Sequence, residues 1–162
     1  AMENAEAARA GDIGVLTVPA DHQISTLELV KDSLAGKILI DVTVPLVPPK
    51  VGTVQMPPEG SAGKRAQDFL GEEVLVVSAF QNIAAHLLQQ DVTIECDVLV
   101  TGNDKESRQR VIDMIGEAGM TGWHAGPIAN AAAAESLTSI LIQINRSGGI
   151  SHSGIKIIGQ EH

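Results

Sequence analysis

Short segments that follow the predicted strands are where this chain could do chemistry. Three of them run from Thr17 to His22, from Thr43 to Pro48 and from Ser78 to Ile83, and a fourth begins at Gly102. They are mostly apolar, with a few amide and hydroxyl groups. Ligands of open α/β sheets bind beyond the carboxyl ends of the strands. Because these segments are mostly apolar, they favour a flat, uncharged ring system over a phosphate.

Familiar motifs of catalysis and phosphate binding do not occur in these 162 residues. There is no Gly-x-Gly-x-x-Gly or Walker-type turn and no Gly-x-Ser-x-Gly elbow, and we name no catalytic residue from the sequence. The histidines lack metal-ligand spacing, so no metal site is predicted, although His22 and His86 stand at strand ends and could touch a ligand. Asp41 could hold a ribose or a backbone turn. Cys96, the single cysteine, is expected to be a small buried hydrophobe.

The elements that must position these segments alternate between strand and helix. Continuous apolar runs bounded by Gly and Pro indicate strands that are buried on both faces. Strands are expected at 13–18, 37–42, 73–78 and 97–101, with a fifth just before Gly126 and a strand or extended tail at 150–158. Helices are expected at 3–10, 22–34, 64–70 and 83–89, and over 103–118 with Asn103 as its N-cap. This order predicts a doubly wound, mostly parallel α/β sheet.

A long helix at 129–146 carries two apolar stripes. The first is expected to face a core, with Glu135 and Ser139 lying off it, and consists of Ala133, Leu137, Ile140, Leu141 and Ile144. The second is the expected subunit contact and consists of Ala131, Ala134, Thr138 and Ile142. The proline-rich stretch from Pro45 to Gly63 is expected to be a long loop, either a binding loop or a disordered segment.

Composition limits the classes of function. A hydrophobic content of 44% with 19% charged residues indicates a globular protein, and the net charge of −9 argues against binding to a nucleic-acid backbone. No apolar run is long enough to span a membrane, and no signal peptide is visible. Together with the single cysteine, these features predict a cytoplasmic protein.

Several segments carry a family resemblance, in order, through nearly the whole chain. They are 12–19 (Asp-Ile-Gly-Val-Leu-Thr-Val-Pro), 37–48, 76–80, 98–102, 125–127 (Ala-Gly-Pro), Asn130, 135–138 (Glu-Ser-Leu-Thr) and 154–159. This pattern resembles the NADPH-dependent reductases of the deazaflavin coenzyme factor 420. The resemblance implies a Rossmann-like fold and direct hydride transfer between NADP(H) and the deazaflavin, in which the protein supplies orientation and excludes water.

The resemblance also implies which residues bind the cofactors. Thr17, Val18, Pro19 and His22 would lie on the nicotinamide side. Val44, Pro45, Leu46 and Val47 would line the deazaflavin side, together with Gln81, Asn82 and Ile83 at the end of the third strand. Gln81 and Asn82 stand where some members of the family have His and Thr.

The matching stretch begins after the family's N-terminal glycine-rich strand–helix–strand unit. Residues 1–162 are therefore expected to form a single, truncated Rossmann-like domain that has lost its main anchor for NADP. Two alternatives stay open: a non-catalytic module for deazaflavin binding, flavin binding or assembly, and one half of a split NADP-linked dehydrogenase. The strand at 13–18 would then have an unpaired edge. We expect a homodimer or larger homo-oligomer through this edge, through the helix at 129–146, or through both.

Overall fold

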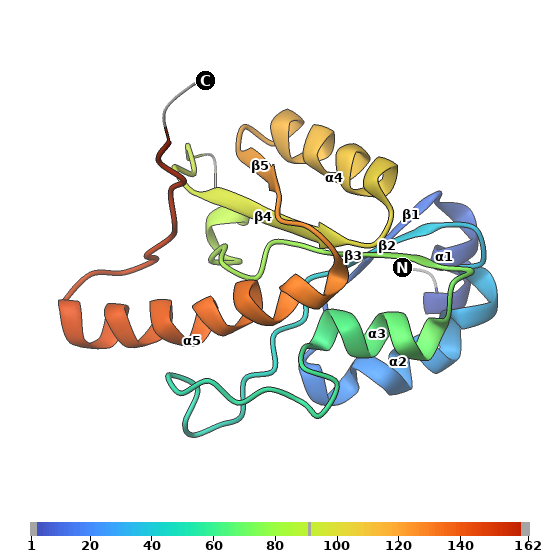
Figure 1. Cartoon of the computed structure of the whole chain (residues 1–162), viewed down its shortest axis with the longest axis horizontal. Coiled ribbons are helices and arrows are strands. Elements are labelled where there is room, and N and C mark those ends of the chain that lie inside the picture. The colour runs from blue at the N-terminus through green and yellow to red at the C-terminus, as the bar shows by residue number, and fades with distance from the viewer. Residues whose placement is uncertain (1–2, 91, 160–162) are drawn as a thin grey trace.

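The computed structural model describes residues 3–90 and 92–159, and it has the predicted α/β fold. Within these residues five strands form one sheet in the order β1-β2-β3-β4-β5 (Figure 1). The strands are β1 (Ile13–Leu16), β2 (Ile38–Asp41), β3 (Leu75–Ser78), β4 (Asp97–Gly102) and β5 (Thr121–His124). The α-helices are α1 (Asn4–Ala10), α2 (Gln23–Val30), α3 (Ala62–Leu70), α4 (Lys105–Glu117) and α5 (Ala131–Gly148). The 3-10 helices are η1 (Ala20–His22), η2 (Lys31–Ser33), η3 (Leu87–Gln89) and η4 (Ile128–Asn130). A mostly parallel sheet with a long C-terminal helix is thus confirmed.

The central strands are covered on both faces, as their apolar runs predict. Successive side chains of a strand point to opposite faces, so Leu39 joins one core cluster while Ile38 and Ile40 join the other. The first cluster contains Leu27, Val30, Ala66 and Leu70 from α2 and α3, and the second contains Val111 and Ile115 from α4. Figure 1 shows α2 and α3 on one side of the sheet and α4 on the other.

Strand β4 runs against its neighbour, and this changes which strand ends lie together. The strands β1, β2 and β3 are parallel, but β4 pairs with β3 antiparallel, with Ser78 opposite Thr101 and Val77 opposite Gly102. The segment after Gly102 therefore lies at the other end of the sheet from Thr17, Thr43 and Ser78. The expectation that all four strand ends share one edge is wrong for β4. Its first residues, at Asp97, lie at that edge instead.

The start of α4 also differs from the expectation. Asp104 is the N-cap, and its carboxylate accepts a hydrogen bond of 2.7 Å from the Ser107 amide. Asn103 instead accepts from the amide of Ile128 at 3.2 Å, because it faces the turn before α5 rather than its own helix.

Strand β1 lies at the edge of the sheet that the described residues form. It is shorter than the expected 13–18 strand, and of its side chains only Leu16 is buried, whereas Val15 is 52% exposed. The expectation of a strand buried on both faces is therefore wrong here. The reason is that Leu16 packs with α2 in the first core cluster, whereas the preceding Val15 points to the opposite face, which is left exposed at this edge of the sheet.

The two faces of α5 are reversed relative to the expectation. Its buried residues are Ala131, Ala134, Glu135, Ser139 and Leu141, whereas Ile140 and Ile144 are 47% and 41% exposed. Only Leu141 of the stripe expected to face the core is buried. The helix ends at Gly149, which adopts the left-handed conformation with φ 65°. Polar Glu135 and Ser139 face inward because the loop and helix packed against them supply hydrogen-bonding partners.

The segment from Val42 to Ser61 is a loop that packs along α5. The Ser139 hydroxyl lies 3.5 Å from the carbonyl oxygen of Thr53, and the Ser136 hydroxyl lies 3.5 Å from the Met56 sulfur. Of the helix expected over 83–89, only η3 forms. The stretch at 150–158 is an extended tail with no strand, and the Ile155 carbonyl accepts from the Asp97 amide at 2.9 Å.

Candidate functional site

The carboxyl ends of β1, β2 and β3 lie side by side and form one edge of the sheet. Leu16 pairs with Asp41, and Asp41 pairs with Ser78, so the three strands end in register. The chain segments that follow them carry all the residues predicted to bind cofactors. The common edge of these three strands is therefore the place where a shared site can be built.

Asp41, the last residue of β2, is the centre of a buried hydrogen-bond network. Its Oδ1 accepts from the Thr43 amide at 2.9 Å and from the Thr43 hydroxyl, and its Oδ2 accepts from Gln23 Nε2 at 2.5 Å. Burial raises the pKa of Asp41, while hydrogen bonds from Thr43 and Gln23 and the charge of Arg65 oppose this shift. Of its two predicted roles, the structure shows Asp41 holding the backbone turn at Thr43.

Gln23 and Arg65 extend this network to α2 and α3. Gln23 Nε2 also donates to the carbonyl oxygen of Ala62 at 2.9 Å. Arg65 Nε donates to Gln23 Oε1 at 2.7 Å, and Arg65 Nη2 donates to the Ala20 carbonyl at 3.0 Å. The guanidinium thus connects the segment after β1 to the first turns of α2 and α3.

Glu135 of α5 is the second buried carboxylate at this edge, and it is 1% exposed. Its oxygens accept from the amides of Ala62 at 2.7 Å and Gly63 at 2.9 Å, at the start of α3. Burial raises the pKa of Glu135 to about 7, and the nearby Asp41 adds to the rise. The two amide hydrogen bonds and the Arg65 charge act in the opposite direction.

Gln81 follows β3 and is 5% exposed. Its side-chain Nε2 donates to the backbone carbonyl of Asp41 at 3.0 Å and to the Ser78 hydroxyl oxygen at 2.7 Å, and the backbone carbonyl of Gln81 accepts from Thr138 Oγ1 at 2.8 Å. A carbonyl such as that of Asp41 can only accept, so the nitrogen of the Gln81 amide must face it. The Gln81 Oε1 atom is left buried, and no donor from the described part of the chain reaches it.

Asn82 and Ile83 lie beside Gln81 but have different surroundings. Asn82 Nδ2 donates to the Asp97 carbonyl at 2.7 Å and to the Cys96 sulfur at 3.1 Å, so this side chain joins β3 to β4. Gln81, Asn82 and Ile83 line a cavity of about 110 Å³, closed on its other side by Thr138 and Leu141 of α5. This small cavity is roomy enough for a fragment of a ring system or for water.

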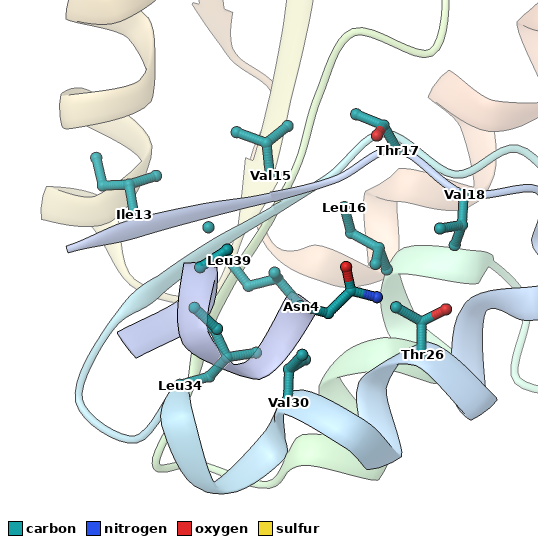
Figure 2. Close-up of a pocket in the computed structure, with 13 residues that line it drawn as sticks. Asn4, Ile13, Val15, Leu16, Thr17, Val18, Thr26, Val30, Leu34 and Leu39 are labelled. Carbon is teal, nitrogen blue, oxygen red and sulfur yellow. The ribbon is translucent and has the colours of Figure 1, made fainter. Parts of the chain in front are cut away.

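The predicted residues after β1 are more exposed. Thr17 and Val18 line an apolar cavity of about 320 Å³ between β1 and the helices α1 and α2 (Figure 2). Pro19 and His22 are exposed, and the His22 carbonyl accepts from the Ser25 hydroxyl at 3.2 Å. In Figure 2 Leu16 and Val18 point toward the helices, whereas Val15 and Thr17 lie on the opposite side of the strand.

The predicted residues after β2 belong to the loop. Val44, Pro45 and Leu46 are half-buried and Val47 is exposed, with the Leu46 amide donating to the Val44 carbonyl at 2.8 Å. The structure thus places the three predicted groups at one edge of the sheet. It does not gather them around one cavity, because Thr17 and Val18 line a different cavity from Gln81, Asn82 and Ile83.

Sequence reasoning missed Glu135, Gln23 and Arg65 as parts of this edge. Glu135 carried a usable signal, since it is an acidic residue inside an otherwise apolar and small-residue stretch of helix. Gln23 and Arg65 carried none, because glutamine and arginine are ordinary residues on helix surfaces. Elsewhere, the rings of His86 and His152 lie 3.9 Å apart, centroid to centroid. Among the residues that the structure describes, no group of three or more His, Cys, Asp and Glu side chains could hold a metal ion.

Comparisons with known proteins agree with this architecture. Residues 1–45 match a family model described as NADP oxidoreductase coenzyme F420-dependent. The F420-dependent NADP reductase of Methanocaldococcus jannaschii is 34% identical over 165 residues, covering 99% of this chain and 74% of that protein. The reductase of the same name from Methanothermobacter marburgensis is also 34% identical, covering 95% of this chain and 71% of that protein. The chain belongs to the family of F420-dependent NADP reductases. This membership confirms the resemblance seen in the sequence.

Solved structures support the family's Rossmann-like fold for this chain. The crystal structure of a candidate F420-dependent NADP reductase from Arthrobacter sp. FB24 matches with a TM-score of 0.84 and 25% identity. That match covers 98% of this chain and 74% of the other. An imine reductase from Myxococcus stipitatus in complex with NADP+ matches with a TM-score of 0.62 and 17% identity, over 92% of this chain and 47% of the other. At that identity the second likeness shows a shared fold alone.

Proposed function

We propose that this member of the F420-dependent NADP reductase family binds the rings of NADP(H) and coenzyme F420 where β1, β2 and β3 end. There it supports hydride transfer between them. Two relatives that carry this name are 34% identical to most of the chain. The observation that carries the proposal lies just after β3, where the side-chain oxygen Oε1 of Gln81 is buried and accepts from no donor of the described chain.

The residues at this edge fit such a ring. A buried acceptor without a donor costs free energy, and a ligand N–H relieves that cost. The amide group of a nicotinamide and the ring N–H of a deazaflavin are donors of this kind. Ile83 lines the same small cavity as Gln81, and Val44, Pro45 and Leu46 add uncharged surface at the same edge of the sheet. Such a surface suits a flat ring better than a phosphate.

The chain's own residues would orient the rings and keep water away. Hydride transfer moves one proton with two electrons directly from one ring to the other, and the coenzymes supply this chemistry. We assign Thr17, Val18, Pro19 and His22 to the nicotinamide side. We assign Val44, Pro45, Leu46 and Val47, with Gln81, Asn82 and Ile83, to the deazaflavin side. The network around Asp41 fixes the three strand ends relative to each other, and such fixed geometry lowers the entropic barrier to transfer.

We identify no residue among these 162 that would bind the phosphates of NADP. They contain no glycine-rich phosphate turn, and the guanidinium of Arg65 is engaged by Gln23 and Ala20. Lys64, the other cation in the first turn of α3, pairs with Asp68 at 2.5 Å. The proposal therefore concerns the ring-binding part of the reaction.

We also propose that the chain assembles into a homodimer and acts in the cytoplasm. Two apolar surfaces favour assembly, namely the outer edge of β1 with Val15 and the face of α5 with Ile140 and Ile144. The described residues contain no helix long and apolar enough to cross a membrane. Cys96 is a free thiol, in keeping with a reducing compartment.

Titration of the purified chain with NADPH and with oxidised F420 tests the proposed function. Binding of both coenzymes with turnover is the expected result. Gln81→Leu should weaken binding of the deazaflavin by about tenfold, because the buried acceptor and its hydrogen bond are lost. Gln109→Leu, the same change on an exposed position of α4, should leave binding unchanged.

Other outcomes of this titration contradict the proposal in distinguishable ways. Binding of the deazaflavin alone would indicate a non-catalytic binding module. Binding of neither coenzyme, restored by an added polypeptide that carries a glycine-rich turn, would indicate half of a split dehydrogenase. The open outer edge of β1 is the feature that would receive such a polypeptide.

A further inference from the structure

The first turn of α3 has an anion built into it from a distant part of the chain. Exposed amides at the start of a helix attract negative charge because of their orientation and the helix dipole. Here the amides of Ala62 and Gly63 donate to the carboxylate of Glu135, which lies 73 and 72 residues further along the chain. Ser61 caps the same turn, accepting from the Lys64 amide at 2.9 Å. An internal carboxylate thus occupies the place that a bound phosphate takes in other helices.

The surroundings of this contact are closely packed. A Cβ atom on Gly63 would lie 2.8 Å from the Ser78 Cβ and 3.2 Å from Cδ1 of Ile128. The start of α3 is therefore pressed against the last residue of β3 and the turn before α5. Glu135 is 1% exposed, so its carboxylate is out of contact with bulk solvent. The carboxylate therefore joins α5 to the start of α3, next to the end of β3.

Both proposed deazaflavin-binding segments are attached to this point. The loop that carries Val44 to Val47 ends at Ser61, directly before the two amides that Glu135 holds. On the other side, Thr138 lies on the same helix as Glu135 and donates to the backbone carbonyl of Gln81 at 2.8 Å. The second turn of α5 thus sets the position of the end of the loop and of Gln81 together.

We propose that Glu135 is a positioning residue, whose carboxylate holds the start of α3, and with it the Val42–Ser61 loop, at a set place beside Gln81. The effect on hydride transfer rests on the proposed function. The effect on the loop does not, because it follows from the contacts alone.

This hold depends on pH. The titratable and charged groups that face Glu135 are Asp41 from β2, which repels a charged carboxylate, and Arg65 from α3, which attracts it. The pKa of Glu135 is raised to about 7 when it is buried, so the buried position is favoured by protonation. As pH rises through 7, the side chain ionises, and the ionised carboxylate favours a solvated position over the buried one. The loop should then open more often.

Hydrogen exchange at the amides of Ala62 and Gly63 tests the inference without any coenzyme. Between about pH 6 and pH 8, their protection, corrected for intrinsic exchange, should fall by about tenfold in the unmodified chain. In Glu135→Gln the side-chain NH2 replaces one acceptor, so protection at pH 6 should be about tenfold lower and should no longer change with pH. Glu117→Gln, the same change on an exposed position of α4, should leave both amides as they are.

Kinetics give the second readout. Glu135→Gln should lower the hydride-transfer rate by about tenfold, because the loop side of the site is misplaced. It should change the affinity for NADPH by no more than about twofold, since the hydrogen bonds of Glu135 go to Ala62 and Gly63 and not to Thr17–Pro19. A mutation that only weakened the fold would lower both.

The outcomes separate this inference from the proposed function. Altered exchange in a chain that binds no coenzyme would support the positioning role and contradict the proposed function. Unaltered exchange with normal turnover would overturn the positioning role and leave the function standing. If Glu135→Gln does not fold, the unmodified chain decides, because pH-independent protection at Ala62 and Gly63 overturns the inference.

Discussion

Two regions of the candidate site differ in which groups they bury and in whether those groups have partners. The α3–α5 junction, formed by Ser61–Gly63, Ser78 and Glu135, is closed, and its carboxylate and amides are paired. The outer edge of β1, which carries Val15, pairs with no other strand of the described residues and lies beside an apolar cavity of about 320 Å³. Polar groups are thus buried at the junction while apolar groups are exposed at the edge.

This difference indicates different roles for the two regions. Burying a carboxylate costs free energy unless it is hydrogen-bonded, so the junction is stable only when all its hydrogen-bonding partners are in place. An apolar strand edge gains free energy by pairing with another strand, so the β1 edge is a surface for association. The junction therefore determines internal geometry, whereas the edge is available to a partner.

The largest expected effect is on the junction and concerns pH. Folded Glu135 has a pKa near 7 and unfolded Glu about 4.5, so the folded chain binds the proton more tightly. Stability is therefore highest below about pH 4.5 as far as this group is concerned and is lost as pH rises through 7. The loss is about 3 kcal/mol at most. The pKa of Asp41 is raised as well, so Asp41 adds to this loss of stability with rising pH.

Urea unfolding at several pH values measures this effect. Glu135→Gln should remove most of the slope between pH 5 and pH 8, whereas Glu117→Gln, which changes the net charge equally, should keep it. Equal slopes in the unmodified chain and in Glu135→Gln would show that folding does not raise the pKa of Glu135.

The next effect concerns the packing of the junction. Gly63→Ala places a methyl group 2.8 Å from the Ser78 Cβ, and overpacking of this kind should cost about 2 kcal/mol. Gly116→Ala is the matched control in α4, where an added Cβ meets nothing within 4 Å and should stabilise the helix by about 0.5–1 kcal/mol. Thermal unfolding of the two variants distinguishes them. A stabilising Gly63→Ala would show that the start of α3 is free to move away from β3.

The smallest effect on stability, but a large one on assembly, is expected at the exposed surfaces. Val15→Lys should change folding stability by no more than about 0.5 kcal/mol and should shift the population from dimer to monomer if the β1 edge pairs with a second copy. Ile140→Glu with Ile144→Glu tests the α5 face in the same way. Light scattering gives the mass, with Gln109→Glu on α4 as control. A monomeric unmodified chain would contradict the proposed assembly.

The sequence predicted the strand and helix order because apolar periodicity depends on local geometry. The runs at 13–18 and 37–42 each became a parallel strand, and the alternation with helices placed α2 and α3 on one face and α4 on the other. The strand-end segments at Thr17, Thr43 and Ser78 were also found, because strand ends are visible as breaks in apolar runs.

Other features were decided by contacts between segments far apart in the chain. Strand direction leaves no mark in an apolar run, so the antiparallel β4 and the displacement of Gly102 could not be foreseen. The inward face of α5 was misjudged for a related reason. A glutamate is expected to face water, and only the amides of Ala62 and Gly63, more than 70 residues away, make its burial favourable.

By itself, then, the sequence determined the α/β class, the apolar central strands, the family resemblance and the uncharged character of the strand ends. Local preferences and side-chain polarity are properties of single residues and their neighbours, and this is why they can be recognised in one chain. The tertiary structure alone decided which strand ends meet, which face of α5 is buried, and that Gln81 keeps an acceptor while Glu135 loses its contact with water. Those outcomes depend on hydrogen-bond partners and packing that exist only after the chain has folded.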